Sequence, residues 1–280
     1  MDKKKLLKKM KKNKKITHKP SYIERMKKYY DLFSDFSDIK YLVNNILEAD
    51  RLLEQKQLPQ DLPILLLPDD IQDTIFAYVN EKYPMGDSKG DAVWNQFVDQ
   101  LPKLDKDIRE FRDYLENQYG MWAYISAPFT NDIAKFLNGK KALEVMAGNG
   151  YISKGLRENG ANVICTDNLA WKKENETGKH LVTDVESLDA IDAFKKYKDE
   201  IDYIIMCWSP DGIDIDWRLL SAIREYGKDI PLITIGEKYG ATDSKQFWDN
   251  AEFIENEDVK KLNRHHKPFD LIEDQLYLVK

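Results

Sequence analysis

Residues 141–168, which read KALEVMAGNGYISKGLRENGANVICTDN, constrain the fold more than any other stretch of this chain. A short apolar run at 142–146 leads into a turn of small residues at 147–150. A helical segment follows, and a second apolar run closes on Asp167. This order of strand, glycine turn, helix and strand predicts a βαβ unit and hence a parallel sheet.

The turn and the acid of this unit are suited to a ligand. Gly148 and Gly150 let the backbone approach a bound molecule where a Cβ would collide with it. The N–H groups that open the next helix attract negative or polar atoms. Asp167, at the end of the second strand, can accept hydrogen bonds from both hydroxyls of a ribose. We expect a nucleoside-containing cofactor here; the alternative is an ordinary glycine turn in an α/β domain that binds no nucleotide.

The spacing of the glycines discriminates between cofactors. A dinucleotide fingerprint, G-x-G-x-x-G, would need a glycine where Ser153 stands, which argues against an NAD-dependent oxidoreductase. Instead, Glu144 precedes Gly148 by four residues. The resulting E-x-x-x-G-x-G pattern resembles motif I of the class I S-adenosylmethionine-dependent methyltransferases, usually D/E-x-G-x-G-x-G. Met146 occupies the position of the first glycine.

The resemblance implies an S-adenosylmethionine site at this edge. It places Glu144 toward the methionine moiety, Asp167 at the ribose, and an acid after the third strand at the adenine amino group, which needs an acceptor. A third strand predicted at 180–185 puts Asp184 there, with a helix N-cap as the alternative role. An aromatic segment before the sheet either covers the cofactor or docks helices onto the sheet. The predicted cofactor-binding residues are Tyr124, Glu144, Met146, Ala147, Gly148, Asn149, Gly150, Asp167, Asn168, Asp184 and Val185.

The predicted fourth strand, 201–208, is almost continuously apolar, as expected of a central parallel strand buried on both faces. It ends in Trp208-Ser209-Pro210-Asp211, where the resemblance places motif IV beside the transferred methyl group. Amino-methyltransferases carry D/N/S-P-P-Y/F/W there; Ser209 and Pro210 match its first half, and Asp211 and Gly212 depart from the second. The alternative is a plain strand-to-turn exit.

A fifth strand at 231–235 delivers Glu237 to the same edge, as a candidate general base or amine ligand. A surface Glu–Lys pair is the alternative role for this residue. The predicted catalytic residues are Trp208, Ser209, Pro210, Asp211 and Glu237.

Apolar periodicity before residue 125 predicts helices at 21–33, 35–55 and 69–83, and one or two more helices at 92–119. We therefore expect a helical extension at 21–125 and an α/β domain at 126–280. The chain carries a net charge of −6, yet residues 1–30 hold 13 Lys and Arg against Asp2 and Glu24. The basic arm at 1–20 is predicted to be disordered, either contacting a polyanion or serving as a solvated tail.

Composition sets further expectations. No apolar run reaches 18 residues, so no membrane span is expected. The N-terminus lacks the apolar region of a secretory signal. The two cysteines, Cys165 and Cys207, have no partner pattern for a disulfide or a metal, which fits a cytoplasmic protein without a metal site.

Together these patterns predict a doubly wound, mostly parallel α/β sheet with an N-terminal helical extension. The predicted function is S-adenosylmethionine-dependent methyl transfer; the acceptor is not identified, and Ser209-Pro210 suggests an amine. The alternative is a non-catalytic module that binds S-adenosylmethionine or a nucleotide and engages a protein or nucleic-acid partner through its helical half. Oligomeric state is left open.

Overall fold

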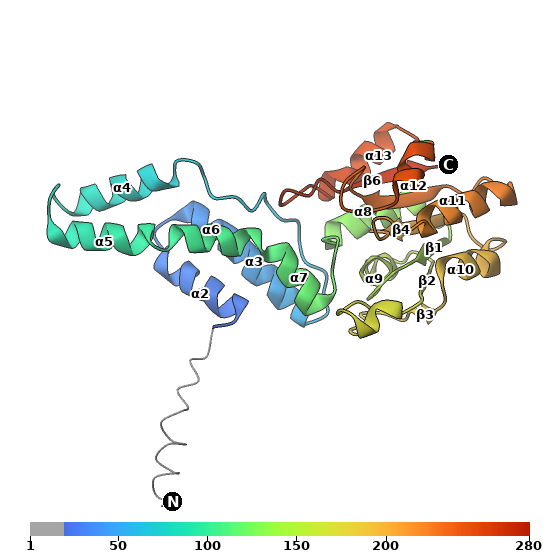
Figure 1. The fold of residues 1–280 in the computed structure, drawn as a ribbon, viewed down its shortest axis with the longest axis horizontal. Helices are drawn as coiled ribbons and strands as arrows, with labels where there is room; N and C mark the ends of the chain where they lie inside the picture. Colours follow the sequence, from blue (N-terminus) through green and yellow to red (C-terminus); the bar gives the residue numbers. More distant parts are fainter. Residues whose placement is uncertain (1–19) are drawn as a thin grey trace, which may run out of the picture.

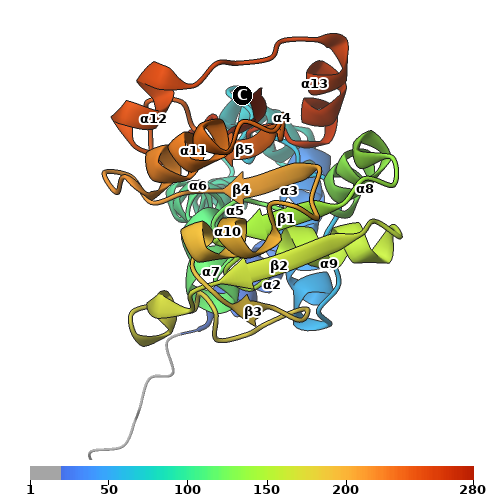
Figure 2. The ribbon, with the colours of Figure 1, turned by 90° about the vertical axis from the view of Figure 1, so that its right-hand side faces the viewer.

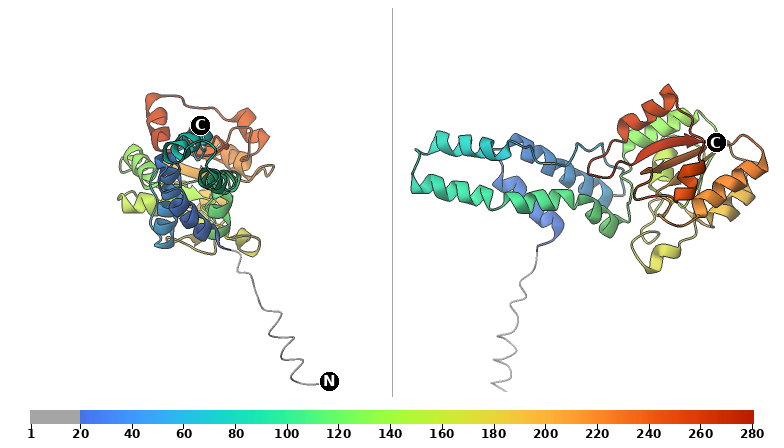
Figure 3. Two further views of the ribbon diagram at one scale, coloured as in Figure 1. Left: turned by 90° about the vertical axis from the view of Figure 1, so that its left-hand side faces the viewer. Right: turned by 45° about the horizontal axis from the view of Figure 1, so that its top comes forward.

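The computed structural model describes residues 20–280, and the predicted basic arm falls almost wholly outside them. A helical extension projects from one side of an α/β domain (Figures 1 and 3). No helix among the described residues has the length and hydropathy needed to cross a membrane. The helices of the extension are α2 (Tyr22–Leu32), α3 (Ser37–Glu54), α4 (Ile71–Lys82), α5 (Ser88–Val98), α6 (Leu101–Arg109) and α7 (Phe111–Tyr119).

The extension packs amphipathic helices around a continuous apolar core that includes Phe33, Ile46 and Phe111. Two buried carboxylates lie within it and are fully partnered. Asp50 accepts hydrogen bonds from the hydroxyls of Tyr114 and Tyr119, and Asp107 accepts from Tyr29 and Arg25. Because these bonds join α2 and α3 to α6 and α7, they hold the helices of the extension together.

The proline-containing connector at 55–70 runs back along the α/β domain. Prolines exclude helix there, so its backbone bonds to other segments. The N–H of Ala127 donates to the carbonyl of Pro59 at 2.8 Å, and the N–H of Leu65 donates to the carbonyl of Phe269 at 2.7 Å. The extension is thus fastened to both ends of the α/β domain's sequence.

The α/β domain contains a six-stranded sheet in the order β3-β2-β1-β4-β5-β6. The first five strands are parallel, and β6 runs antiparallel to β5. This arrangement confirms the predicted doubly wound, mostly parallel sheet. The strands are β1 (Ala142–Val145), β2 (Val163–Asp167), β3 (Glu186–Ser187), β4 (Tyr203–Cys207), β5 (Leu232–Gly236) and β6 (Gln275–Val279).

Helices cover both faces of the sheet, with α8, α9 and α13 on one side and α10, α11 and α12 on the other (Figure 2). Ile205 packs into the core shared with the extension, whereas its neighbours Ile204 and Met206 pack into the opposite core. Burial on both faces explains why β4, which contains these residues, is apolar along almost its whole length. These helices are α8 (Ala127–Leu137), α9 (Tyr151–Glu158), α10 (Ala190–Tyr197), α11 (Ile215–Tyr226), α12 (Lys245–Asn250) and α13 (Glu257–Leu262), with 3-10 turns η1 (Ala170–Lys173) and η2 (Asn263–His265).

The predicted third strand at 180–185 is wrong, because β3 is the two-residue Glu186–Ser187. The segment before it bonds to the glycine turn and α9 instead of to β2. The N–H of Val182 donates to the carbonyl of Asn149, and the guanidinium of Arg157 donates to the hydroxyl of Thr183 and the carbonyl of Asp184. The alternation of apolar residues there reflects this local packing.

Candidate functional site

A cavity of about 770 Å³ opens where β1, β2 and β4 end. This is the edge at which doubly wound sheets bind ligands, and the volume lies within the range of ligand pockets. One part of its wall comes from the strand ends and the other from the end of the helical extension. From the α/β domain, the lining residues include Glu144, Met146, Ala147, Gly148, Asn149, Asp167, Asn168, Asp189, Trp208, Ser209, Pro210 and Asp211.

The turn after β1 is left-handed at three positions. Met146, Gly148 and Gly150 have φ values of 53°, 57° and 83°. A Cβ on Gly150 would come within 2.8 Å of the Thr183 side chain, so glycine is required there for space as well as for conformation. Met146 thus adopts the glycine-favouring conformation at the position where the resembled motif has its first glycine, and this conformation is strained for a side chain.

Asp167 closes the turn onto β2. Its buried carboxylate accepts hydrogen bonds from the N–H groups of Gly148 at 2.8 Å and Leu169 at 2.6 Å. Burial raises the pKa of Asp167, while these two bonds oppose the shift. A carboxylate has about four acceptor sites, so Asp167 retains capacity toward the cavity that it lines.

Glu144 is buried in β1 and ties that strand to the start of α9. Its Oε2 atom accepts hydrogen bonds from the Ser153 N–H at 2.9 Å, from the Ser153 hydroxyl and from the Cys165 thiol at 3.7 Å. Burial raises the pKa of Glu144 to about 7, although the bonds from Ser153 lower it. The serine that breaks the dinucleotide fingerprint is therefore the partner of the motif's acid.

The turn after β4 brings Trp208 and Ser209 to the cavity. Trp208 has a φ of 52°, and its indole N–H donates to the buried carboxylate of Asp274 at 2.9 Å. The Ser209 carbonyl accepts from the Asp243 N–H at 2.8 Å. The hydroxyl oxygen of Ser209 is buried without a hydrogen-bond partner among the described residues. This turn is therefore strained and contains an unused polar atom.

The helical extension supplies the facing wall, through Glu116 on α7 and the segment that follows α7. The indole N–H of Trp122 donates to the Thr177 hydroxyl at 2.9 Å, and the ring centroids of Trp122 and Trp208 lie 6.4 Å apart. Sequence reasoning missed Glu116, because α7 carries several acids and no local pattern singles out the one that faces a cavity.

Five predicted site residues lie outside this cavity: Tyr124, Gly150 and Glu237, and also Asp184 and Val185, which line a second pocket. The Tyr124 hydroxyl donates to the Gln60 carbonyl, and its ring packs against Phe269, so it docks the connector onto the domain. The Glu237 carboxylate accepts from the N–H of Ala241, which closes its own loop, and from the N–H of Glu273, which ties that loop to the segment before β6. Gly150 shapes the turn but faces Thr183 and Val185.

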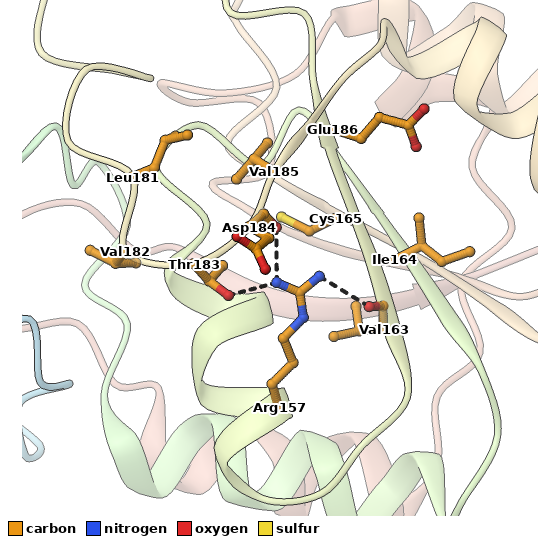
Figure 4. Close-up of a pocket in the computed structure, with 10 residues that line it drawn as sticks. All are labelled: Arg157, Val163, Ile164, Cys165, Leu181, Val182, Thr183, Asp184, Val185 and Glu186. Atoms are coloured by element: carbon orange, nitrogen blue, oxygen red, sulfur yellow. Dashed lines mark hydrogen bonds between the residues drawn. The ribbon is translucent and has the colours of Figure 1, made fainter.

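Asp184 and Val185 line a separate, shallow pocket (Figure 4). There the Arg157 guanidinium donates to the Thr183 hydroxyl at 2.6 Å and to the Asp184 carbonyl at 2.8 Å. The acid that follows the third strand and lines the main cavity is instead Asp189, two residues after β3. It caps α10 by accepting from the N–H groups of Ile191 and Asp192. Its N-cap position before an apolar helix is a signal that sequence reasoning missed.

Comparisons with known proteins give structural resemblances only: no protein-family model matches the chain, and no curated protein does. Solved structures that resemble it include TehB from Haemophilus influenzae (15% identity, 60% of this chain, TM-score 0.33). Another is M. capricolum TrmK with S-adenosyl-homocysteine (17% identity, 54% of this chain, TM-score 0.32). A third is the magnesium protoporphyrin IX methyltransferase ChlM from Synechocystis PCC 6803 with bound SAM (12% identity, 60% of this chain, TM-score 0.33). The alignments span 66% of TehB and of TrmK and 94% of ChlM.

Proposed function

We propose that this chain binds S-adenosylmethionine and transfers its methyl group to an acceptor held over the Trp208–Asp211 turn. One observation carries the proposal. A single cavity joins the glycine turn and the Asp167 carboxylate to the turn after β4. A cofactor held at the first and an acceptor held at the second would therefore be neighbours, as a transfer between them requires.

The residues present fit the cofactor. Gly148 faces the cavity in a left-handed conformation and leaves the backbone uncovered there. Asp167 retains acceptor capacity for ribose hydroxyls, and Asp189 offers an acceptor to the adenine amino group. Glu144 supports the turn from beneath through Ser153. Met146 has a φ of 53°, a conformation that glycine favours, at the position where the resembled motif has its first glycine.

The protein's own contribution is positioning and exclusion of water. When bound, S-adenosylmethionine supplies a methyl group that is already activated by its sulfonium, so little further chemistry is needed. Trp208, Ile213 and Ile272 give the acceptor side an apolar lining. Ser209 presents a buried hydroxyl that can hydrogen-bond the acceptor, and we infer that an amine is the acceptor that best suits it.

Calorimetric titration with S-adenosylmethionine, S-adenosylhomocysteine and NAD tests the proposal. We expect both adenosyl ligands to bind, and Asp167→Ala to weaken them by about 100-fold, since bonds to a buried charged group contribute about 1.5–3 kcal/mol each. Asp184→Ala is the matched control, because Asp184 lies in the other pocket and its loss should leave affinity within about twofold.

Failure of wild-type protein to bind either adenosyl ligand would overturn the proposal, and tighter binding of NAD would point to an oxidoreductase. Thermal melting of both variants separates lost contacts from lost folding, because Asp167 also holds the Gly148 N–H. Adenosyl binding with no methyl transfer to any acceptor class tested would favour the alternative of a non-catalytic module.

A further inference from the structure

The acceptor side of the cavity is formed jointly by the α/β domain and the helical extension. Trp208 comes from the turn after β4, and Trp122 and Glu116 come from the extension. The ligand groups that these three side chains can bind limit which classes of molecule can be the acceptor. The inference that follows rests on the proposed function, because it concerns the other ligand of the same cavity.

The two tryptophans offer ring surface and no free donor. The indole N–H of Trp122 is taken by the Thr177 hydroxyl, and that of Trp208 is taken by the Asp274 carboxylate, both at 2.9 Å. The electron-rich faces of such rings attract cations and stack on planar groups. The centroids of Trp122 and Trp208 are 6.4 Å apart, so the two rings pack on each other, and a ligand can lie only against their joint surface. Such a ligand meets apolar and π surface and cannot receive a hydrogen bond from either indole N–H.

One cation already lies against Trp208. The guanidinium carbon of Arg112 is 5.0 Å from the Trp208 ring centroid. Arg112 also donates two hydrogen bonds to the Asp270 carboxylate and one, at 2.7 Å, to the Trp122 carbonyl. Because its charge is balanced by Asp270 and each of its three nitrogens already donates a hydrogen bond, Arg112 fixes the wall and does not supply a free positive charge to the cavity.

Glu116 lies one helical turn from Arg112 and lines the cavity. Its half-buried carboxylate forms no hydrogen bond and no ion pair within 4 Å among residues 20–280. Burial raises the pKa of Glu116 to about 7; Arg112 opposes this shift, and Asp113 and Asp270 add to it. An uncompensated carboxylate in such a position is costly, and a cationic ligand would offset that cost.

Ser209 supplies an independent indication that the ligand has a polar group at this point of the cavity. The residue is 1% exposed and lines the cavity, and its hydroxyl oxygen has no hydrogen-bond partner among the described residues. Buried hydroxyls are normally satisfied. An amine nitrogen can donate to this oxygen while its carbon skeleton remains in the apolar part of the cavity.

We propose that the acceptor is a primary or secondary amine that enters as a cation, with Glu116 as its counter-ion and with Trp122 and Trp208 against its body. An ammonium nitrogen has no lone pair, so it must lose one proton before it can take up a methyl group. The Glu116 carboxylate accepts that proton and becomes a neutral carboxyl group, which leaves a neutral amine beside Ser209.

Binding of matched amine–alcohol pairs tests this directly. The full chain is saturated with S-adenosylhomocysteine at pH 8 and titrated calorimetrically with tyramine, tyrosol, butylamine and butan-1-ol. Tyramine carries an ammonium group where tyrosol carries a hydroxyl, and butylamine differs from butan-1-ol in the same way. We expect wild-type protein to bind at least one amine ten times more tightly than its alcohol. Glu116→Gln should remove this preference, and Asp113→Asn, an exposed acid on the same helix, should retain it.

The outcomes separate this inference from the proposed function. If wild-type protein binds S-adenosylhomocysteine but prefers neither amine, or if Glu116→Gln keeps the preference, the amine inference fails and the cofactor proposal stands. If wild-type protein does not bind S-adenosylhomocysteine, the cofactor proposal fails, and the same titrations of unloaded protein decide the preference for cations. Unchanged affinity of Glu116→Gln for S-adenosylhomocysteine shows that the variant is folded. If the variant does not fold, the amine and alcohol affinities of wild-type protein still test the inference.

Discussion

The helical extension and the carboxyl edge of the sheet differ in how completely they satisfy buried polar groups. In the extension, the carboxylates of Asp50 and Asp107 are each satisfied by two side chains. At the edge, polar atoms are buried without a hydrogen bond of good geometry. Among residues 20–280, all such side-chain atoms lie in the α/β domain: Ser209 Oγ, Thr234 Oγ1, Asp243 Oδ1 and His266 Nε2.

The backbone shows the same contrast. Within the described residues, seven that are not glycine have positive φ, and only Lys56 belongs to the extension or its connector. Five follow strand ends: Met146, Leu169, Trp208, Tyr239 and Asp243. Strained and unsatisfied groups of the described residues concentrate in the α/β domain, and three of them, Met146, Trp208 and Ser209, line the cavity. They are tolerated because the rest of the chain is locally consistent.

The largest effect that tests this contrast is expected from Asp107→Ala in the extension. The substitution leaves the Arg25 guanidinium and the Tyr29 hydroxyl without their buried acceptor. Breaking a buried pair on one side costs about 3–5 kcal/mol, and the partial exposure of Arg25 places the expected loss at the lower end. Guanidinium-induced unfolding measures it as a fall in the transition midpoint.

Asp105→Ala is the control, since its pair with Arg109 lies on the surface of the same helix and contributes about 0.5 kcal/mol or less. Equal losses from Asp105→Ala and Asp107→Ala would show that the extension does not depend on its buried network. The contrast with the edge would then have no energetic basis.

Asp243→Asn in the α/β domain is expected to increase the stability of the fold, whereas Asp107→Ala lowers it. Burial raises the pKa of Asp243 to about 7, and the nearby Asp216 carboxylate adds to the shift while a bond from Thr242 opposes it. Asparagine has the same shape and tolerates the left-handed conformation that Asp243 adopts. Asparagine carries no charge to bury, so the variant should be more stable than wild type by about 1–3 kcal/mol at pH 8.

The stabilisation by Asp243→Asn should depend on pH. The folded-state pKa of Asp243 lies above the unfolded value near 3.8, so its contribution to stability is full below about pH 4 and is lost as pH rises toward 7. The advantage of Asp243→Asn should therefore be absent at pH 4 and complete above pH 7. Asp249→Asn, an exposed position on α12, should show no such trend. An advantage that is independent of pH would mean that ionisation of Asp243 is not its source.

Most of the fold could be predicted, because it follows from apolar periodicity. The helix predicted at 35–55 is α3, and the apolar runs ending at Asp167 and Trp208 are β2 and β4. The region 92–119 forms part of three helices where one or two were expected, since no glycine or proline marks the break between α6 and α7. The two-residue β3 carries too little pattern to be recognised.

The site could be predicted only where its chemistry lies within one local motif. Met146 to Gly148, Asp167 and the turn at 208–211 lie together at the cavity, because parallel strands end at one edge. Glu237 and Asp184 were plausible on position alone, yet the first closes its own loop and the second lines another pocket. Glu116 and Trp122 reach the site through the packing of a separate helical region, which spacing within the sequence does not encode.

The smallest expected effect is the difference in stability between a glycine and an alanine at one position in each region. At Met146, whose φ is 53°, both substitutions remove the side chain, but only alanine keeps a Cβ in the left-handed conformation. Met146→Gly should therefore be more stable than Met146→Ala by about 1 kcal/mol. At Ala49 in α3, glycine should instead be less stable than alanine by about 1 kcal/mol, because helix interiors penalise it. Urea unfolding resolves both differences, and a glycine that is no better than alanine at position 146 would show that the turn holds no strain to release.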